Sequence, residues 1–389
     1  MSEWIRRGSP RSPGIDKVLA LATVALLVIG TLLVWSATSH EVDPYAYLKR
    51  HLVNVAIGLL LSAAVMATDH RYLRLLAPAV YGVSLIGLML VLVMGSTING
   101  SRSWLRFAGM SVQPAEFAKF AVVMMLALAV AERVERARPR RTVSDVAVLL
   151  GLAGAPAALI LLQPDLGTML VLAATVVGVL AVSGLPGRWL GGLVGAGVVG
   201  VVGVVAAGVL KPYQIDRFLA FIDPALDPRG AGYNTIQARI AIGNGGIFGQ
   251  GHFHGSQTRA GFVPEQQTDF VFTVAGEELG LLGAGVVVLL LGLVIWRATL
   301  ISLQASDLFG RVAAAGIACW LGFQAFQNIG MCLGIMPVTG VPLPLLSYGG
   351  SSMFATLMAI GLLHNIAMRG TVIPLSLLPR PREFNARVG

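Results

Sequence analysis

The chain is poor in charged residues and contains very little cysteine. Asp, Glu, Lys and Arg make up only 12% of its 389 residues, whereas soluble domains carry about 25%. Because 56% of the residues are hydrophobic, an ordinary soluble domain is excluded. The two cysteines, Cys319 and Cys332, fall in one apolar run, where a helix would separate them by about 20 Å. That separation excludes a disulfide between them.

Long apolar runs dominate the sequence. A membrane-spanning helix needs about 20 mostly apolar residues. The runs do not alternate as barrel strands do, so helices are predicted. The fold class is therefore an all-α integral membrane protein with about ten transmembrane helices. The ten candidate runs are 18–37, 49–67, 73–95, 114–132, 143–162, 166–184, 187–210, 270–297, 308–334 and 349–368.

The net charge of +9 has a distribution typical of membrane topology. Most Lys and Arg residues fall on alternate connections, which places both termini in the cytoplasm. Nucleic-acid binding is excluded, because the basic residues are spread over many helix ends without an aromatic platform. We predict cytoplasmic tails at 1–16 and 371–389 around a membrane domain at 17–370. A large extracytoplasmic loop at 211–268 separates helices seven and eight, and a short surface helix is expected within it near 233–242.

Charged side chains inside membrane helices cost about 2.5–3.5 kcal/mol each on insertion scales, so they mark candidate functional positions. Glu116 and Lys119 form one such pair, three residues apart on one predicted helix face. A salt bridge that holds the bundle together is one interpretation. The other is a polar cavity in which Lys119 meets an anionic group of a substrate. The two can hold together.

A second acidic group surrounds the start of the eighth predicted helix. Asp269 ends the long loop, Glu265 precedes it, and Glu277 and Glu278 follow within the apolar run. Asp269 would lie where water, headgroups and hydrocarbon meet, which suits a catalytic base. A helix N-cap is the alternative role for Asp269. Glu277 is also a candidate to line the substrate cavity. For Glu277 and Glu278 the alternative is an internal hydrogen bond or a helix contact.

Three further segments contribute candidates around the same predicted outer cavity. Asp165, in Gln163-Pro-Asp-Leu-Gly-Thr, can line the cavity or cap the sixth helix. The loop 96–113 carries Arg102 and Arg106 on either side of Trp104. Ser347 lies in a Pro- and Gly-broken segment, and such backbone persists at membrane depth only when it is buried or lines a cavity.

Several ordered motifs together resemble the SEDS family of peptidoglycan polymerases, over about residues 15–370. Within the family, the loop run 220–228 and the segment 328–344 resemble the elongation branch more than the division branch. Gln266 and Gln267 depart from the usual pattern, which puts headgroup contacts there in doubt. The motifs are Arg102-Ser-Trp-Leu-Arg106, Gln113-Pro-Ala-Glu-Phe-Ala-Lys119, Gln163-Pro-Asp-Leu-Gly-Thr168, Asp227-Pro-Arg-Gly-Ala-Gly-Tyr-Asn-Thr-Ile-Gln237, Pro264-Glu-Gln-Gln-Thr-Asp269-Phe, Gly276-Glu-Glu-Leu-Gly280 and Pro342-Leu-Pro-Leu-Leu-Ser347-Tyr-Gly-Gly-Ser351.

The resemblance implies ten spanning helices and an enzyme that joins lipid II molecules into glycan strands on the outer face of the bacterial cytoplasmic membrane. It implies that Asp269 matches an essential aspartate of the family. The usual partner of a family member is a class B penicillin-binding protein, here expected to be a transpeptidase of the elongation machinery. The family positions around the central cavity match Arg102, Trp104, Glu116, Lys119 and Asp165 in this chain.

The reaction expected from this resemblance needs a base and a counter-charge. Asp269 would remove a proton from the acceptor hydroxyl, a contribution of roughly 10²–10⁴-fold. Lys119, Arg217 of the outer loop or a divalent cation, Mg²⁺ or Mn²⁺, would offset the charge on the diphosphate leaving group. No dedicated metal cage is visible in the sequence. A single displacement predicts inversion at the sugar.

Two functions from other classes are also compatible with the sequence. A flippase for lipid-linked precursors could use a cavity lined by Glu116 and Lys119, but it has no evident need for a base at Asp269. A scaffold in cell-wall assembly would act only through its partner. Asp269→Asn separates both from the polymerase, because only the polymerase requires the carboxylate.

Overall fold

Five helices begin at an aspartate whose side chain accepts a hydrogen bond from the backbone of the first turn, which is a strong local signal for a helix start. The computed structural model describes residues 14–98, 101–107, 110–135, 143–184, 187–206, 220–223, 227 and 230–369. The predicted tails therefore lie almost entirely outside the described residues. The capping aspartates are Asp16, Asp43, Asp69, Asp165 and Asp307.

All ten predicted apolar runs contain a helix. Among the described residues, eight helices are long and apolar enough to cross a membrane; α6 has only 17 residues, and α7 is not one of the eight. The chain is thus a multi-pass helical membrane protein. The helices are α1 Lys17–Ala37, α2 Pro44–Ala67, α3 His70–Met94, α4 Pro114–Glu135, α5 Val143–Leu162, α6 Leu166–Val182, α7 Gly187–Ala206, α9 Ala231–Asn244, α10 Ser256–Ala260, α11 Val271–Gln304, α12 Leu308–Leu333 and α13 Gly350–Arg369.

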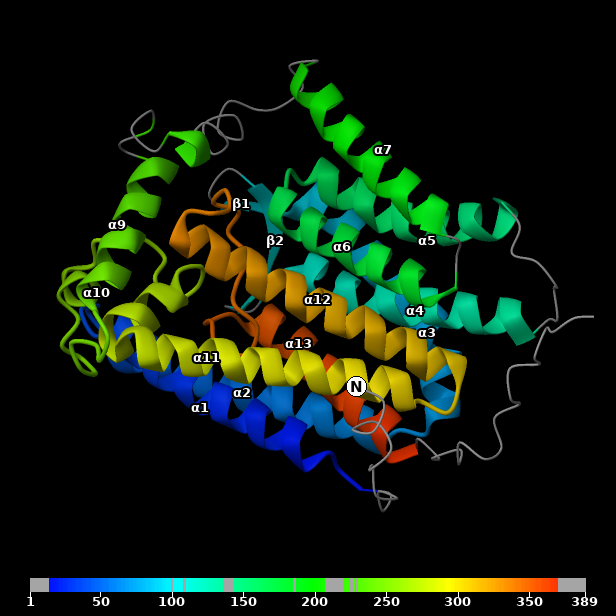
Figure 1. The fold of residues 1–389 in the computed structure, drawn as a ribbon, viewed down its shortest axis with the longest axis horizontal. Coiled ribbons are helices and arrows are strands. Elements are labelled where there is room, and N and C mark those ends of the chain that lie inside the picture. Colours follow the sequence, from blue (N-terminus) through cyan, green and yellow to red (C-terminus); the bar gives the residue numbers. More distant parts are fainter. Residues whose placement is uncertain are drawn as a thin grey trace, which may run out of the picture.

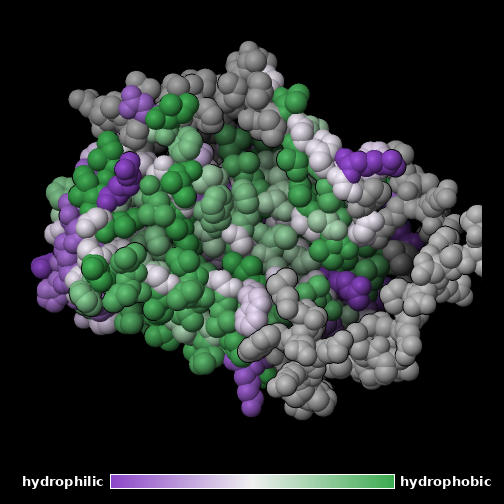
Figure 2. Space-filling view, in the orientation of Figure 1, coloured by the Kyte–Doolittle hydropathy of each residue, from purple (hydrophilic) through white to green (hydrophobic). Residues whose placement is uncertain are grey.

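The long helices run side by side, and α9 and α10 gather at one end of the bundle, which we call the α10 end (Figure 1). The opposite end, where Asp16 pairs with buried Arg297, we call the tail end. The loop helix predicted near 233–242 is confirmed as α9, Ala231–Asn244. Hydrophobic side chains cover the middle of the face drawn in Figure 2, and polar ones gather along the edge near α10.

The core lies around α4. In the apolar 18-residue stretch of α4, 89% of the residues are buried, whereas in that of α2 only 11% are. Helix α4 is therefore central and α2 peripheral. Helix α4 packs against α3, α12 and α13, while α12 also packs against α6 and α11. The polar residues Glu116 and Lys119 of α4 are thus enclosed by other helices.

A small antiparallel sheet of three strands lies between α3 and α4, where the sequence predicted only a loop. Its order is β1-β2-β3, with β1 Ser96–Ile98, β2 Ser101–Phe107 and β3 Met110–Val112. Trp104 pairs with Ser96 and Arg106 with Ser111. The alternation of Trp104, Arg106 and the serines around them is a strand pattern that the loop prediction overlooked.

Helix α11 is broken at Gly280, whose φ of 67° and ψ of −168° lie outside the helical region. The loop after α9 supplies hydrogen bonds to the opened backbone. Gln250 and Gly251 donate to the carbonyls of Glu277 and Glu278 at 2.9 and 3.0 Å, and Leu281 donates to Gly246 at 2.9 Å. A break inside a membrane helix is tolerated when its polar groups are satisfied in this way.

Candidate functional site

Asp269 lies half-buried at the α10 end, at the close of a turn that begins at Glu265. Its backbone N–H donates to the Glu265 carbonyl at 3.0 Å, and its carbonyl accepts from the Asn328 side-chain amide at 2.7 Å. Helix α11 starts at Val271 with Phe270 at the N-cap position. The N-cap alternative for Asp269 is therefore wrong, and the residue lies just before the helix start with its backbone hydrogen-bonded.

Glu116 and Lys119 form the predicted pair, fully enclosed in the bundle. Lys119 Nζ lies 2.8 Å from Glu116 Oε1 and 2.8 Å from Gln324 Oε1, and it stands 5.2 Å from the centre of the Trp320 ring. Both charged residues are buried, at 1% and 0% exposure. Because Lys119 is fully buried, a direct contact with a substrate anion would require the surrounding helices to open, even though one of its three N–H donors is not used by Glu116 or Gln324.

Asp165 caps α6, which confirms one of its two predicted roles. Its carboxylate accepts from Thr168 N at 3.0 Å, from Thr168 Oγ1 at 2.8 Å and from Gln113 Nε2 at 3.0 Å. Burial raises the pKa of the Asp165 carboxyl, against the opposing effect of the Thr168 hydrogen bonds. The charges of Glu116 and Lys119 also act on this pKa, so α4 and the start of α6 share one polar region.

Glu277 and Glu278 have internal partners, as the alternative interpretation predicted. The Glu277 carboxylate accepts from the backbone N–H groups of Gln257 and Thr258 at 2.7 and 2.9 Å, and from the Thr258 hydroxyl at 2.7 Å. Glu278 accepts from the Ser36 hydroxyl of α1 and lies 3.1 Å from His252 Nδ1. Together they fix α10, the loop before it and the end of α1 to the first half of α11.

The remaining predicted site residues have mixed placements. Arg102 donates to the carbonyls of Gly95 and Val93 at 2.8 and 2.7 Å, so its guanidinium caps the end of α3. Trp104 is half-buried and Arg106 is exposed. Ser347 is buried and its hydroxyl accepts from Leu343 N at 2.8 Å, which closes a turn. Arg217 lies outside the described residues.

Gln266, one of the two departures from the family pattern, points inward. It is buried, and its side-chain amide donates to the carbonyls of Ala37 and Thr258 at 2.6 and 3.0 Å. It therefore ties the turn before Asp269 to α1 and α10. A headgroup contact for this side chain does not fit its position.

The sequence interpretation missed a row of uncharged polar residues on α12. Gln324, Gln327 and Asn328 are all fully buried, and their spacing places them on one helix face. Gln324 donates to the Pro342 carbonyl at 2.8 Å and Gln327 to the Thr339 hydroxyl at 2.8 Å. Three amides at this spacing in an otherwise apolar run were the available signal.

The segment 335–349, which joins α12 to α13, is irregular and lies against this row. Asn328 donates to the Val341 carbonyl at 2.7 Å as well as to Asp269. Hydrogen bonds connect the α4 pair to Pro342 through Gln324, and Asp269 to Val341 through Asn328. The two sets meet in the backbone, because Val341 and Pro342 are neighbours in the chain. The backbone of this segment is non-helical as predicted, and its residues 343–347 are buried, whereas a cavity wall here stays a prediction.

Metal ligands are sparse in the described part of the chain, which contains no group of three or more His, Cys, Asp or Glu residues placed to hold an ion. The carboxylates of Glu277 and Glu278 are occupied by hydrogen bonds from the protein.

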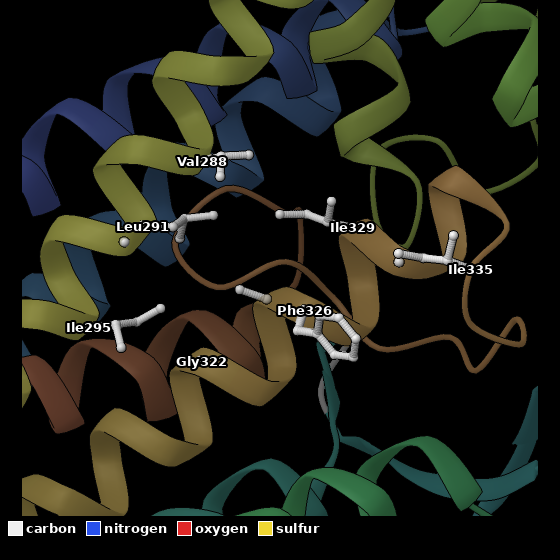
Figure 3. A pocket seen from close by; sticks show the side chains of 10 residues that line it. Val288, Leu291, Ile295, Gly322, Phe326, Ile329 and Ile335 are labelled. Atoms are coloured by element: carbon white, nitrogen blue, oxygen red, sulfur yellow. The ribbon is translucent and has the colours of Figure 1, made fainter.

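An apolar groove of about 270 Å³ lies between α11 and α12, away from the polar region. Figure 3 shows Val288, Leu291 and Ile295 of α11 facing Phe326 and Ile329 of α12. Small residues line part of it and leave room for the close approach of another helix. These small residues are Gly292, Gly322, Ala325 and Gly330.

The comparisons agree with this architecture. Peptidoglycan glycosyltransferase MrdB of Escherichia coli K12 is 37% identical over 90% of this chain and 93% of its own, and stage V sporulation protein E of Bacillus subtilis is 35% identical over 90% and 96%. The solved structure of Thermus thermophilus rod shape determining protein RodA superposes with a TM-score of 0.68, at 34% identity, over 92% of this chain and 98% of that one. A chain of a solved peptidoglycan synthase complex gives 0.77, at 37% identity, over 91% and 98%. The sequence model of the FtsW, RodA and SpoVE family of cell cycle proteins matches residues 16–371, and the chain belongs to this family.

Proposed function

We propose that this chain is a peptidoglycan glycosyltransferase that polymerises lipid II into glycan strands. One observation carries the proposal: Asp269 is half-buried at the end of a membrane-embedded bundle, and its backbone is anchored there, because its N–H donates to the Glu265 carbonyl and its carbonyl accepts from Asn328. A substrate with a lipid anchor and a polar reactive part needs a base at such a position. The relatives named as peptidoglycan glycosyltransferases support the same reaction.

In this mechanism Asp269 acts as general base on the acceptor hydroxyl. Removal of the proton as the hydroxyl attacks the anomeric carbon contributes roughly 10²–10⁴-fold. The bond from that carbon to the diphosphate breaks in the same displacement, so an α-linked donor gives a β-linked product. The exposed Arg106 is available to the departing diphosphate, and Arg217 is a further candidate from the sequence. A Mg²⁺ or Mn²⁺ bound with the diphosphate would supply additional positive charge.

The α10 end faces the outside of the bacterial cytoplasmic membrane in this proposal, and both termini face the cytoplasm. The distribution of Lys and Arg along the sequence supports this orientation. The tail end, with Asp16, Arg297 and Arg369, is then cytoplasmic. Asp269 consequently meets lipid II after it has reached the outer leaflet.

The partner proposed for this enzyme is a class B penicillin-binding protein within the elongation machinery. The match to a chain of a peptidoglycan synthase complex, described as coordinating polymerization and crosslinking, supports a transpeptidase partner. The groove between α11 and α12 suits a single apolar helix of that partner, because Gly292, Gly322 and Gly330 permit close packing. Cysteine crosslinking from Gly322→Cys to the partner's membrane helix tests this contact, and no crosslink would place the partner elsewhere.

The elongation role is favoured over the division role by the MrdB and RodA relatives, together with the motifs at 220–228 and 328–344. Division-type FtsW relatives match at similar identity, so a cellular assay decides between the two. Depletion should give round cells if the chain serves elongation. Filaments that fail to divide would assign it to division instead.

The test of the reaction is polymerisation of labelled lipid II by the full chain with its transpeptidase partner in liposomes. We expect strands from the wild type and none from Asp269→Asn. Glu265→Gln is the matched control, because it removes an exposed carboxylate from the same turn. Equal strands from Asp269→Asn would move the base elsewhere. Transfer of lipid II across the bilayer without any strands would favour a flippase.

A further inference from the structure

The backbone on both sides of Asp269 is held in place. Its N–H group is bound within the turn at 3.0 Å from the Glu265 carbonyl, and its carbonyl is bound at 2.7 Å by Asn328 Nδ2. Two residues before Asp269, the Gln267 carbonyl accepts a hydrogen bond from Tyr348 N at 2.8 Å. These bonds fix the backbone from which the Asp269 carboxylate projects.

Asn328 is the side chain that joins this turn to the segment 335–349. It is fully buried, and its single amide nitrogen reaches the carbonyls of Asp269 and Val341, both at 2.7 Å. A side-chain amide has two N–H donors, so both are used. Among uncharged side chains only the amides of Asn and Gln supply two donors from one atom, and loss of Asn328 leaves two carbonyls without these partners.

Gly340 limits the space that the Asp269 carboxylate can occupy. Its φ is +70°, and a Cβ built there would lie 3.2 Å from Asp269 Oδ2. The carboxylate therefore packs against backbone that has no side chain. An added methyl group would push on the carboxylate as well as strain the backbone.

We propose that Asn328 is a positioning residue for Asp269, and that Gly340 shapes the space its carboxylate occupies. The inference rests on the proposed function of Asp269 as base. Asn328 does not touch the reacting atoms; it sets where the base stands relative to the segment 335–349, which is joined through Pro342 and Gln324 to the buried Lys119. Displacement of a catalytic group by about 1 Å can lower a rate by roughly 10²-fold.

The first experiment compares Asn328→Leu with Gln327→Leu in the full chain with its partner, using lipid II polymerisation in liposomes. Gln327 is the matched control, since it is equally buried, lies next in the helix and bonds the same segment through Thr339 without contacting Asp269. We expect Asn328→Leu to lower kcat roughly 10²-fold with little change in KM. Gln327→Leu should stay within about tenfold of the wild type while lowering the melting temperature similarly.

The second comparison uses two glycines with the same backbone conformation. Gly340→Ala and Gly334→Ala introduce a methyl group at φ of +70° and +75°, and a Cβ at Gly334 meets Thr235 and Arg239 instead of Asp269. Only Gly340→Ala should lower kcat and shift the acidic limb of its pH profile, because only it presses on the carboxylate.

The outcomes separate this inference from the proposed function. If Asp269→Asn is inactive while Asn328→Leu matches Gln327→Leu in kcat, Asn328 is structural only and the inference is overturned. If Asp269→Asn retains activity, the assignment of the base fails first. Equal losses in Gly340→Ala and Gly334→Ala would likewise attribute the effect to backbone strain.

Discussion

Replacement of Gly280 by alanine gives the sharpest test of the broken helix. Gly280 has φ of 67° and ψ of −168°, a conformation that is essentially restricted to glycine and costs other residues about 1–3 kcal/mol. A Cβ there would also lie 2.2 Å from Gly249 N and 2.6 Å from the Ile247 carbonyl. Because both obstacles are backbone atoms, no side chain can rotate away. We expect Gly280→Ala to lower stability by about 3 kcal/mol or more.

The assay is thermal unfolding of the purified protein in detergent, with limited proteolysis of the loop 245–251. Gly285→Ala is the matched control, because it adds the same methyl group five residues further along α11, where no atom lies within 4 Å. In a regular helix that change stabilises by up to about 1 kcal/mol. A Gly280→Ala protein as stable as Gly285→Ala, with an equally protected loop, would refute the break.

Other substitutions test the polar contacts. Glu277→Gln should lower stability by about 1–3 kcal/mol and expose α10 to protease, because it weakens an acceptor of several hydrogen bonds; unchanged proteolysis would contradict this. Lys119→Met should lower stability by about 3–5 kcal/mol by leaving Glu116 charged and buried, and the double variant with Glu116→Leu should recover most of it in thermal unfolding. The Arg71 backbone N–H and Arg369 hold the pKa of Asp69 below its ordinary value, so its stabilisation is present above the unfolded pKa and lost as the pH falls through the folded one. The melting-temperature difference between wild type and Asp69→Asn should therefore shrink on acidification, and a constant difference would contradict this.

Much of the fold followed from local signals in the sequence. Long apolar runs located the helices, and aspartates such as Asp43 and Asp307 marked their starts. The Glu116 and Lys119 pair was predictable because charges within apolar runs require partners, and a spacing of three residues supplies one. These inferences rest on near neighbours in the chain, where the geometry is set by helix periodicity.

Long-range contacts were the part that the sequence could not specify. Nothing local indicates that Glu277 accepts from the start of α10, some twenty residues earlier, or that Glu278 meets Ser36 of α1. The break at Gly280 was equally hidden, since a glycine in an apolar run is usually tolerated as helix. Buried amides such as Asn328 were overlooked because they carry no charge, although their cost without partners is comparable to that of other buried polar groups.

The first half of α11 explains why carboxylates so close in sequence serve different purposes. Residues 271–279 form a short helical block, with Asp269 just before it and the break at Gly280 just after it. Glu277 and Glu278, about 100° apart around the helix, bind α10 on one side and α1 with His252 on the other. The block is thereby fixed from two directions, and its position carries Asp269 with it. Hydrogen bonds more than ten ångströms from Asp269 along the helix should therefore affect catalysis by changing where the base lies. Loss of the Glu277 hydrogen bonds to α10 is accordingly expected to lower polymerisation under conditions in which the protein is still folded.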